Sequence, residues 1–380
     1  MFPSILIAFL LLLMSLSITS LQAQLEYSNW IWGDSNQLVF TANSATPQTG
    51  PSFIPYGSSP RGHASISDRN GQLLFYISAD TIMDRNGDSI ANGRLKNARG
   101  VSICPLPCND SLYYVFSTAG IDNNNPVTMG LFYQIVNVRG NGGLGSIYQQ
   151  STMLDSTVNQ ALDFSITRHS NNTDYWIALR NKHDTNSAMH AWQITDSGIV
   201  ANPVSSLYET FPNAAIYYSL NDFSPHGGYY AQSFQTSGTG GISQTRLLSF
   251  DNSTGQFQLI GTFNEANLSS PNENHSVAFS PDGSKLYCVS AYRALWQFDL
   301  SSGNASTMLN SGQDIAAFST NFPNGMAGLR LGMNGKIYVT RAFGNNATTY
   351  LGVINNPNDT GSACNFVLNG LQCNQKTYVV

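Results

Sequence analysis

Residues 277–303 read VAFSPDGSKLYCVSAYRALWQFDLSSG, and two apolar runs in this stretch flank a tight turn before a third apolar run follows. The turn is Pro281-Asp282-Gly283-Ser284. An Asp-Gly pair between apolar runs is a strong hairpin signal, because type I′ turns need positive φ at both central residues. The stretch therefore predicts a β-meander of three strands.

Variants of this unit recur along the chain with a period of about 50 residues. The six copies begin with residues 64–77, 101–116, 163–179, 222–231, 277–290 and 329–339. Such a period, with about four short strands per repeat, is typical of kelch-like β-propeller blades. Strands such as Leu286–Val289 are apolar on both faces, as expected for a sheet packed between two neighbours.

We predict an all-β fold, a single closed β-propeller domain of about seven four-stranded blades. The atypical first strands, within Trp30–Phe40, would belong to a shared blade. We expect the ring to close by pairing one of these strands with strands near the C-terminus, because an open ring would leave an exposed sheet edge.

The composition limits the classes of partner. Of the 380 residues, 42% are hydrophobic and 10% are charged, with a net charge of -5 and a pI of about 5.6. No basic residues cluster, so nucleic acid and anionic membrane surfaces are not expected to bind.

The N-terminus predicts export. Ile5–Ile18 is an almost unbroken apolar run, and Ala23 offers a small residue for cleavage. The run is too short to span a bilayer of roughly 30 Å, which favours a signal peptide over a retained membrane anchor. We predict a signal peptide at residues 1–23 and a propeller domain at residues 24–380, secreted or held at the outer cell surface.

Five cysteines in an exported chain suggest disulfides, with one thiol left over. Cys104 and Cys108 flank an expected hairpin turn, and a short hairpin brings two Cα atoms within the roughly 4.4–6.8 Å that a bridge needs. Cys364 and Cys373 form the second predicted pair. Cys288, inside a strand, is interpreted as a buried apolar thiol.

Two motifs resemble ligand sites but favour turns. Residues 140–145 read GNGGLG and fit G-x-G-x-x-G, yet no helix of useful length follows, so we expect no dinucleotide cofactor. Asp84, Asn86 and Asp88 begin like a calcium loop, but the closing Glu and the central Gly are missing. A solvated turn is the preferred reading there, and no metal site is predicted.

The histidines show no metal-binding or catalytic spacing, and no G-x-S-x-G motif occurs. They are His63, His169, His183, His190, His226 and His275. Each is interpreted as a turn or core residue.

Several segments together resemble a known family. They are residues 64–76, 141–145, 174–177, 279–287, 335–339 and 353–366. In this order they are similar to the N-terminal β-propeller region of gliding-motility-associated, type IX-secreted surface proteins of Bacteroidetes. The resemblance covers nearly the whole mature chain, and it implies a propeller followed by PKD-like domains and a C-terminal sorting domain. The sequence stops at Val380, inside the last expected blade, so either the protein is free or its sequence continues further.

Two classes of function remain open. A non-catalytic, monomeric module would bind protein or glycan through blade-connecting loops, without cofactor or catalytic residues. The alternative is a secreted hydrolase or lyase with a carboxylate site facing the channel. Glu209 with Asp222, and Glu265 with Glu273, are acidic pairs expected in loops without a recognisable motif. The scarcity of charged residues favours binding.

Overall fold

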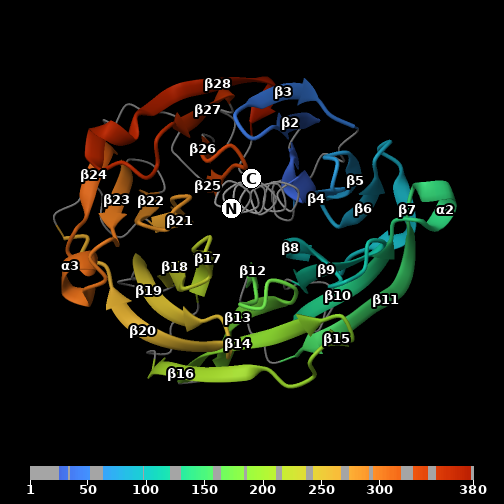
Figure 1. The fold of residues 1–380 in the computed structure, drawn as a ribbon, viewed down its shortest axis with the longest axis horizontal. Coiled ribbons are helices and arrows are strands. Elements are labelled where there is room, and N and C mark those ends of the chain that lie inside the picture. Colours follow the sequence, from blue (N-terminus) through green and yellow to red (C-terminus); the bar gives the residue numbers. More distant parts are fainter. Residues whose placement is uncertain are drawn as a thin grey trace, which may run out of the picture.

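The computed structural model describes residues 25–32, 35–51, 63–96, 98–119, 130–156, 164–183, 186–210, 216–236, 243–266, 274–290, 294–317, 328–340 and 348–377. Seven antiparallel sheets of this part of the chain follow one another around a central axis (Figure 1). The predicted seven-bladed β-propeller is confirmed. The predicted signal peptide lies outside the described residues.

Each sheet is one blade, numbered in sequence order. Blade 1 contains β1 (Asn29–Trp32), β2 (Asn36–Phe40) and β3 (Ala45–Thr49); blade 2 contains β4 (Ala64–Ser67), β5 (Leu73–Ser78), β6 (Thr81–Asp84) and β7 (Ser89–Arg94); blade 3 contains β8 (Ala98–Pro105), β9 (Leu112–Ala119), β10 (Gly130–Asn137) and β11 (Ser146–Asp155). Blade 4 contains β12 (Phe164–Arg168), β13 (Tyr175–His183), β14 (Asn186–Thr195), β15 (Gly198–Ile199) and β16 (Val204–Thr210).

The remaining blades each have four strands. Blade 5 contains β17 (Ile216–Phe223), β18 (Tyr229–Thr236), β19 (Ser243–Asp251) and β20 (Gln256–Thr262); blade 6 contains β21 (Asn274–Phe279), β22 (Lys285–Ser290), β23 (Ala294–Asp299) and β24 (Gln313–Ala317); blade 7 contains β25 (Gly328–Leu331), β26 (Ile337–Thr340), β27 (Thr348–Ile354) and β28 (Phe366–Thr377). The helical turns are η1 (Leu25–Tyr27), α2 (Gly140–Gly143), α3 (Ala305–Leu309) and η2 (Gly361–Cys364). In the described ranges, no helix has the length and apolar character needed to cross a membrane.

The repeated hairpin joins the first and second strands of blades 2 to 7. In blade 6, Val277 lies opposite Cys288, and the N–H of Gly283 donates to the carbonyl of Ser280 at 2.9 Å. Only Gly283 of this turn has a positive φ, 70°, so the hairpin is confirmed but the turn is not type I′. The same bond and a positive φ recur at Gly71, Asn172, Gly227 and Gly335.

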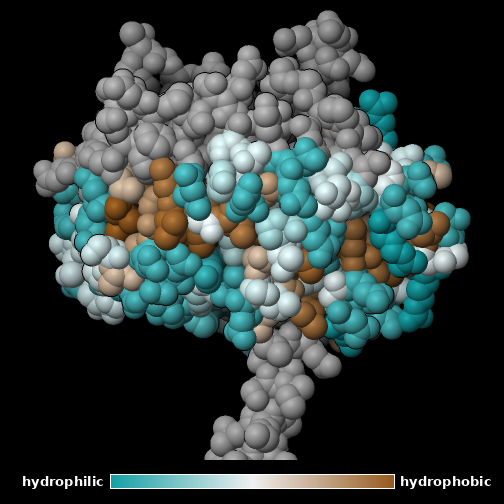
Figure 2. All heavy atoms as spheres, turned by 90° about the horizontal axis from the view of Figure 1, so that it is seen from above, coloured by the Kyte–Doolittle hydropathy of each residue, from teal (hydrophilic) through white to brown (hydrophobic). Residues whose placement is uncertain are grey.

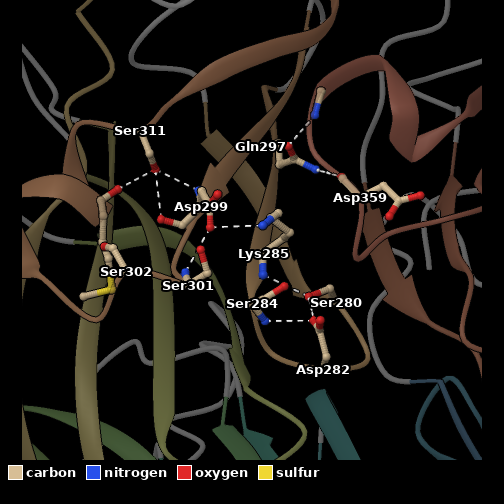
Figure 3. Close-up of polar contacts among 12 residues, drawn as sticks. Ser280, Asp282, Ser284, Lys285, Gln297, Asp299, Ser301, Ser302, Ser311 and Asp359 are labelled. Atoms are coloured by element: carbon tan, nitrogen blue, oxygen red, sulfur yellow. Dashed lines mark hydrogen bonds and ion pairs between the residues drawn. The ribbon is translucent and has the colours of Figure 1, made fainter.

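The last residue of the third strand begins a second tight turn. The Asp299 carboxylate accepts a hydrogen bond from the N–H of Ser301 at 2.9 Å and lies 3.0 Å from Lys285 Nζ (Figure 3). Side-chain oxygens cap the N–H two residues later in the same way at Asp84, Asn137 and Asp251. This Asx turn is local, because the capping side chain and the capped N–H lie two residues apart.

Both sets of turns lie at one end of the ring, because neighbouring strands alternate in direction. We call it the hairpin-turn end. Turns of successive blades touch there: a Cβ on Gly283 would lie 3.8 Å from Ser224 Cβ, and one on Gly335 would lie 3.7 Å from Pro281 Cγ. The connections between second and third strands, and those between blades, leave from the opposite end.

Apolar side chains fill each junction between neighbouring blades. Trp176 of blade 4 packs with Phe223 and Phe250 of blade 5, and Leu247 of blade 5 packs with Phe279 and Trp296 of blade 6. Every junction around the ring has a cluster of this kind. The apolar character of both strand faces therefore follows from burial on both sides. Seen from the side, the outer wall of the ring carries mostly polar residues with apolar groups between them (Figure 2).

The expected closure of the ring by strand pairing is wrong. Within the described ranges, β1, β2 and β3 pair only with one another, because β1 and β2, with Trp32 opposite Asn36, pair as neighbours along the chain. Blade 1 meets blade 7 through side chains: the backbone N–H of Gln375 donates to Asn36 Oδ1 at 3.1 Å. Apolar packing among residues such as Trp32 and Tyr338 completes the junction.

Candidate functional site

Charged residues stand on several of the innermost strands, which surround the central axis (Figure 1), and two of them, Asp222 and Arg330, act on each other's charge. Asp222 is on β17 of blade 5, and Arg330 is on β25 of blade 7. Arg330 is the one exposed residue of β25, whereas Gly328 and Leu329 are buried against neighbouring blades. An exposed side chain on an innermost strand opens to the channel. We call Asp222, Arg330 and Trp30 the channel site.

Nearby protein partly shields both charges from water, although Arg330 stays exposed and Asp222 is only partly buried. Burial raises the pKa of the Asp222 carboxyl to about 7, although Arg330 and the N–H of Phe223 act in the opposite direction. Burial also lowers the pKa of Arg330, while Asp222 and Tyr27 favour its charged form. The guanidinium carbon of Arg330 lies 5.3 Å from the centre of the Trp30 ring, within cation–π range.

The channel site can hold or move a proton near neutral pH. With a pKa of about 7, the Asp222 carboxyl is divided at pH 7 between an acid that donates and a carboxylate that accepts hydrogen bonds. Arg330 adds donors beside it, and Trp30 adds an aromatic surface. The combination suits a polar ligand that carries hydroxyl or carboxylate groups.

More polar side chains lie toward the hairpin-turn end. The guanidinium of Arg168, at the end of β12, lies 5.1 Å from the Tyr175 ring centre and donates to the carbonyl of Asn172 at 3.0 Å. Burial raises the pKa of the Glu26 carboxyl, and the charges of Arg168 and Arg69 oppose that shift. These residues come from blades 2 and 4 and from η1.

The acidic pairs expected in loops are placed differently. Asp222 is on an inner strand rather than in a loop. Glu265 is buried just after β20, where it accepts a hydrogen bond from the N–H of Thr245 at 3.2 Å. Glu273 and the side chain of Glu209 lie outside the described residues, so neither pairing is tested.

Neither predicted disulfide is present, and all five cysteines are free thiols. Cys104 points into the core between blades 3 and 4, whereas Cys108 is exposed in the turn with a φ of 56°. Cys364 packs between blades 6 and 7, and Cys373 packs between blades 7 and 1. In each predicted pair, the two cysteines therefore lie in different environments.

Cys288 has the environment expected of it. It is fully buried in the cluster between blades 5 and 6. Burial raises the pKa of its thiol well above the ordinary value, which keeps it protonated and unreactive.

The glycine-rich motif is a turn, as interpreted. Gly140–Gly143 forms only the short α2, with left-handed backbone at Asn141 and Gly142, and it connects β10 to β11. A dinucleotide site needs a longer helix at this position.

Asp84, the first residue of the calcium-like motif, caps a turn with its side-chain carboxylate. The Asp84 carboxylate accepts hydrogen bonds from the N–H groups of Asn86 at 2.8 Å and Asp88 at 3.1 Å. Among the residues that the structure describes, no cluster of three metal-ligating side chains occurs.

Two histidines make specific contacts. His169 stacks on Trp176 with ring centres 5.4 Å apart. His190 Nδ1 lies 3.4 Å from a carboxylate oxygen of Asp155 in blade 3, and both side chains are largely buried. These contacts are structural, in a turn and at a junction between blades.

Comparison with known proteins supports the fold. No protein-family model and no curated protein matches the sequence. A protein from Lactobacillus plantarum aligns with a TM-score of 0.54 at 12% identity, over 92% of this chain and 96% of that chain. A Bacteroides uniformis protein, provisionally described as a 6-phosphogluconolactonase, gives 0.48 at 14% over 90% and 92%. The Swd1 β-propeller domain of Myceliophteria thermophila gives 0.45 at 9% over 83% and 94%. At 12% identity, the likeness to the Lactobacillus plantarum protein shows a shared fold alone.

Proposed function

We propose that this protein is an exported, monomeric and non-catalytic β-propeller that binds protein or glycan at the end of the ring opposite the hairpin turns. Its location, secreted or at the outer cell surface, follows from the predicted signal peptide. The resemblance to propellers of gliding Bacteroidetes points the same way. The proposed partners do not include nucleic acid.

The difference between the two ends of the ring carries this proposal. At the hairpin-turn end, short turns such as Ser280–Ser284 satisfy their own polar groups. The opposite end receives the longer connections, for example those between Thr49 and Ala64, Ala119 and Gly130, and Ala317 and Gly328. A rigid frame that holds long connections together at one end is the common arrangement of binding proteins.

The sequence of these connections suits recognition. Residues 52–62 read SFIPYGSSPRG and residues 318–327 read FSTNFPNGMA. Both combine aromatic residues with Ser and Gly, and residues 318–327 add Asn, a mixture that supplies contact area together with adaptable hydrogen bonds.

The test compares the two ends of the ring. The purified protein is applied to a glycan array and to immobilised surface polymers and proteins, and a variant with residues 318–327 replaced by a Gly-Ser linker is tested beside it. We expect the wild type to bind and the linker variant to lose at least ten-fold in affinity, about 1.4 kcal/mol. Asp282→Asn at the hairpin-turn end is the control that keeps binding. Equal binding by all three proteins would contradict the proposal.

One observation favours the enzymatic alternative. The Asp222 carboxyl has a pKa of about 7 beside Arg330, as suits a general acid or base at neutral pH. A hydrolysis screen on the same purified protein addresses it. Turnover that Asp222→Asn abolishes, with folding intact, would replace the binding proposal by a hydrolase or lyase.

A further inference from the structure

Two arginines are buried at the junction of blades 4 and 5, which lie side by side in the ring (Figure 1). Arg180 is on β13 and is 7% exposed, and Arg246 is on β19 and is 6% exposed. Arginine is almost never buried to this degree unless its charge is compensated. Two such side chains at one junction therefore indicate a place where negative charge is bound.

The alternation of side chains along each strand directs both arginines into the same junction. Ala178 of β13 packs in the apolar cluster between blades 4 and 5, so Arg180, two residues further on, also faces blade 5. Leu248 of β19 packs in the same cluster, so Arg246, two residues before it, faces blade 4. The two arginines thus face each other's blade.

A contact across the junction shows that the arginines belong to one layer of side chains. Gln232 Nε2 of β18 donates to Met189 Sδ of β14 at 3.4 Å. Met189 lies opposite Arg180 in blade 4, and Gln232 lies opposite Arg246 in blade 5. Directly opposite residues on one sheet face have Cβ atoms roughly 4.5–5.5 Å apart. Arg180 and Arg246 therefore flank the Gln232–Met189 contact from its two sides.

This layer is close to the end of the ring opposite the hairpin turns. Beyond the arginines, the β13–β14 ladder continues for three residue pairs to His183 and Asn186, and the β18–β19 ladder continues for three pairs to Gln235 and Ser243. At about 3.3 Å per residue, both arginines lie about 10 Å from the strand ends. A ligand held by the connections at that end is within reach of them.

The arginines provide donors for an anion. Arg246 Nη2 donates to Gln244 Oε1 at 3.4 Å, and both arginines also interact with other groups of the protein. Because a guanidinium has five N–H donors in a fixed planar array, it can bind a carboxylate beside its protein partners. Burial holds each guanidinium in position before a ligand arrives.

Two amide side chains complete the layer on the inner side. Gln232 is buried, and Asn221 of β17 lies directly opposite it in the same sheet. An amide accepts hydrogen bonds as well as donating them, whereas a guanidinium only donates. The layer thus matches a ligand in which a carboxylate is next to hydroxyl groups.

We propose that Arg180 and Arg246, with the amides of Gln232 and Asn221, bind a uronic acid unit of an acidic glycan. The carboxylate accepts hydrogen bonds from the guanidinium groups, and the neighbouring hydroxyls donate to the amide oxygens. This inference rests on the proposed function, since it names the class of ligand that is bound at the end opposite the hairpin turns.

Calorimetric titration with a glucuronic acid oligosaccharide tests the site, and a glucose oligosaccharide of the same length is the neutral control ligand. We expect the wild type to bind the acidic oligosaccharide only. Arg180→Met and Arg246→Met should each lower the affinity by about ten-fold or more, because each removes charge-assisted hydrogen bonds. Arg94→Met, at an arginine of β7 whose side chain is 82% exposed, should keep the wild-type affinity.

A second variant keeps the test decisive if the arginine variants do not fold. Gln232→Glu places a carboxylate of the protein between the two arginines, so we expect a folded protein whose affinity for the acidic oligosaccharide is at least about ten-fold lower. Gln258→Glu makes the same charge change at an exposed position of β20 and should bind like the wild type.

Wild-type affinity in Gln232→Glu and in the arginine variants that fold would overturn the site. Binding of a glutamate peptide in place of the oligosaccharide would overturn it as well, since the ligand would then be a protein. If the wild type binds only neutral glycans or proteins, the inference fails and the proposed function stands. Cleavage of the oligosaccharide that depends on both arginines would support the site and contradict the non-catalytic function.

Discussion

The two junctions on either side of blade 7 are built differently. At the junction with blade 6, buried Gln297 donates from Nε2 to the Asp359 carbonyl at 2.7 Å (Figure 3). Nε2 also donates to Tyr287 Oη at 2.6 Å, while Oε1 accepts from the Gly361 N–H and from Gln313. Gly361 and Asp359 belong to blade 7, so one side chain clamps two blades.

The closing junction with blade 1 depends on aromatic packing. The Tyr338 ring meets Trp30 and Phe40 edge-on, with ring centres 5.7 and 5.6 Å apart. One hydrogen bond across it, from Asn374 Nδ2 to Thr49 Oγ1, is 3.5 Å long. Blades 6 and 7 are thus clamped by a polar network in addition to their apolar packing, and blades 7 and 1 are brought together by aromatic side chains. The difference shows that the junction of blades 7 and 1, which closes the ring, has a less directional interface than the junction of blades 6 and 7.

The largest expected effect is at the closing junction. Tyr338→Ala removes a buried ring from the cluster that joins blades 7 and 1, and we expect it to lower the free energy of unfolding by about 3–5 kcal/mol. Urea denaturation measures this loss. Tyr148→Ala, at an exposed position, should change it by less than about 0.5 kcal/mol. Equal losses of stability in both variants would contradict a stabilising role of the aromatic packing at the closing junction.

The next effect is at the junction of blades 6 and 7. Gln297→Leu keeps the approximate volume but leaves the N–H of Gly361 and the amide of Gln313 without this partner, so we expect a loss of about 2 kcal/mol. Gln258→Leu, on an exposed position of β20, is the matched control in the same assay. A neutral Gln297→Leu would mean that the clamp is dispensable.

A smaller effect depends on pH and concerns Asp222 of blade 5 together with Arg330 of blade 7. The Asp222 carboxyl has a raised pKa of about 7, so between pH 4 and 7 the folded protein binds more protons than the unfolded chain, and stability falls as pH rises. Asp222→Asn should flatten this decline, measured as the melting temperature from pH 5 to 8. Arg330→Met should move the decline to higher pH, because the arginine favours the carboxylate. An unchanged pH profile in both variants would contradict the assigned environment.

The smallest effect is again at the closing junction. Asn374→Ala removes one long, exposed hydrogen bond, and we expect a change within about 0.5 kcal/mol. A loss above about 2 kcal/mol would show that polar contacts hold this junction as firmly as the clamp holds the other.

The sequence predicted what depends on neighbours along the chain. The hairpins were predictable because a left-handed turn position favours Gly or Asn, as at Gly283 and Asn172. The Asx turns at Asp251 and Asp299 repeat the same local chemistry, and an alignment of the repeats on these residues would have sharpened the blade boundaries.

What depends on distant parts of the chain was not predictable in this way. Spacing placed Cys104 and Cys108 close together but could not give the direction of either side chain. Asp222 and Arg330 act on each other's charge only because the ring brings inner strands of blades 5 and 7 toward one axis. The available signal was a lone charge in each of two strands, Asp222 in β17 and Arg330 in β25, and it becomes informative once the strands are known to be innermost.

The three-stranded first blade has a consequence for how such rings can change in number. In the described ranges, β1–β3 pair only with one another, so the strands of blade 1 come from one contiguous stretch of sequence. Duplication or loss of one contiguous gene segment would then add or remove a whole blade without disturbing the closure. A ring of this kind can be extended by simple recombination, whereas a ring closed by a shared strand must preserve both halves of its divided repeat.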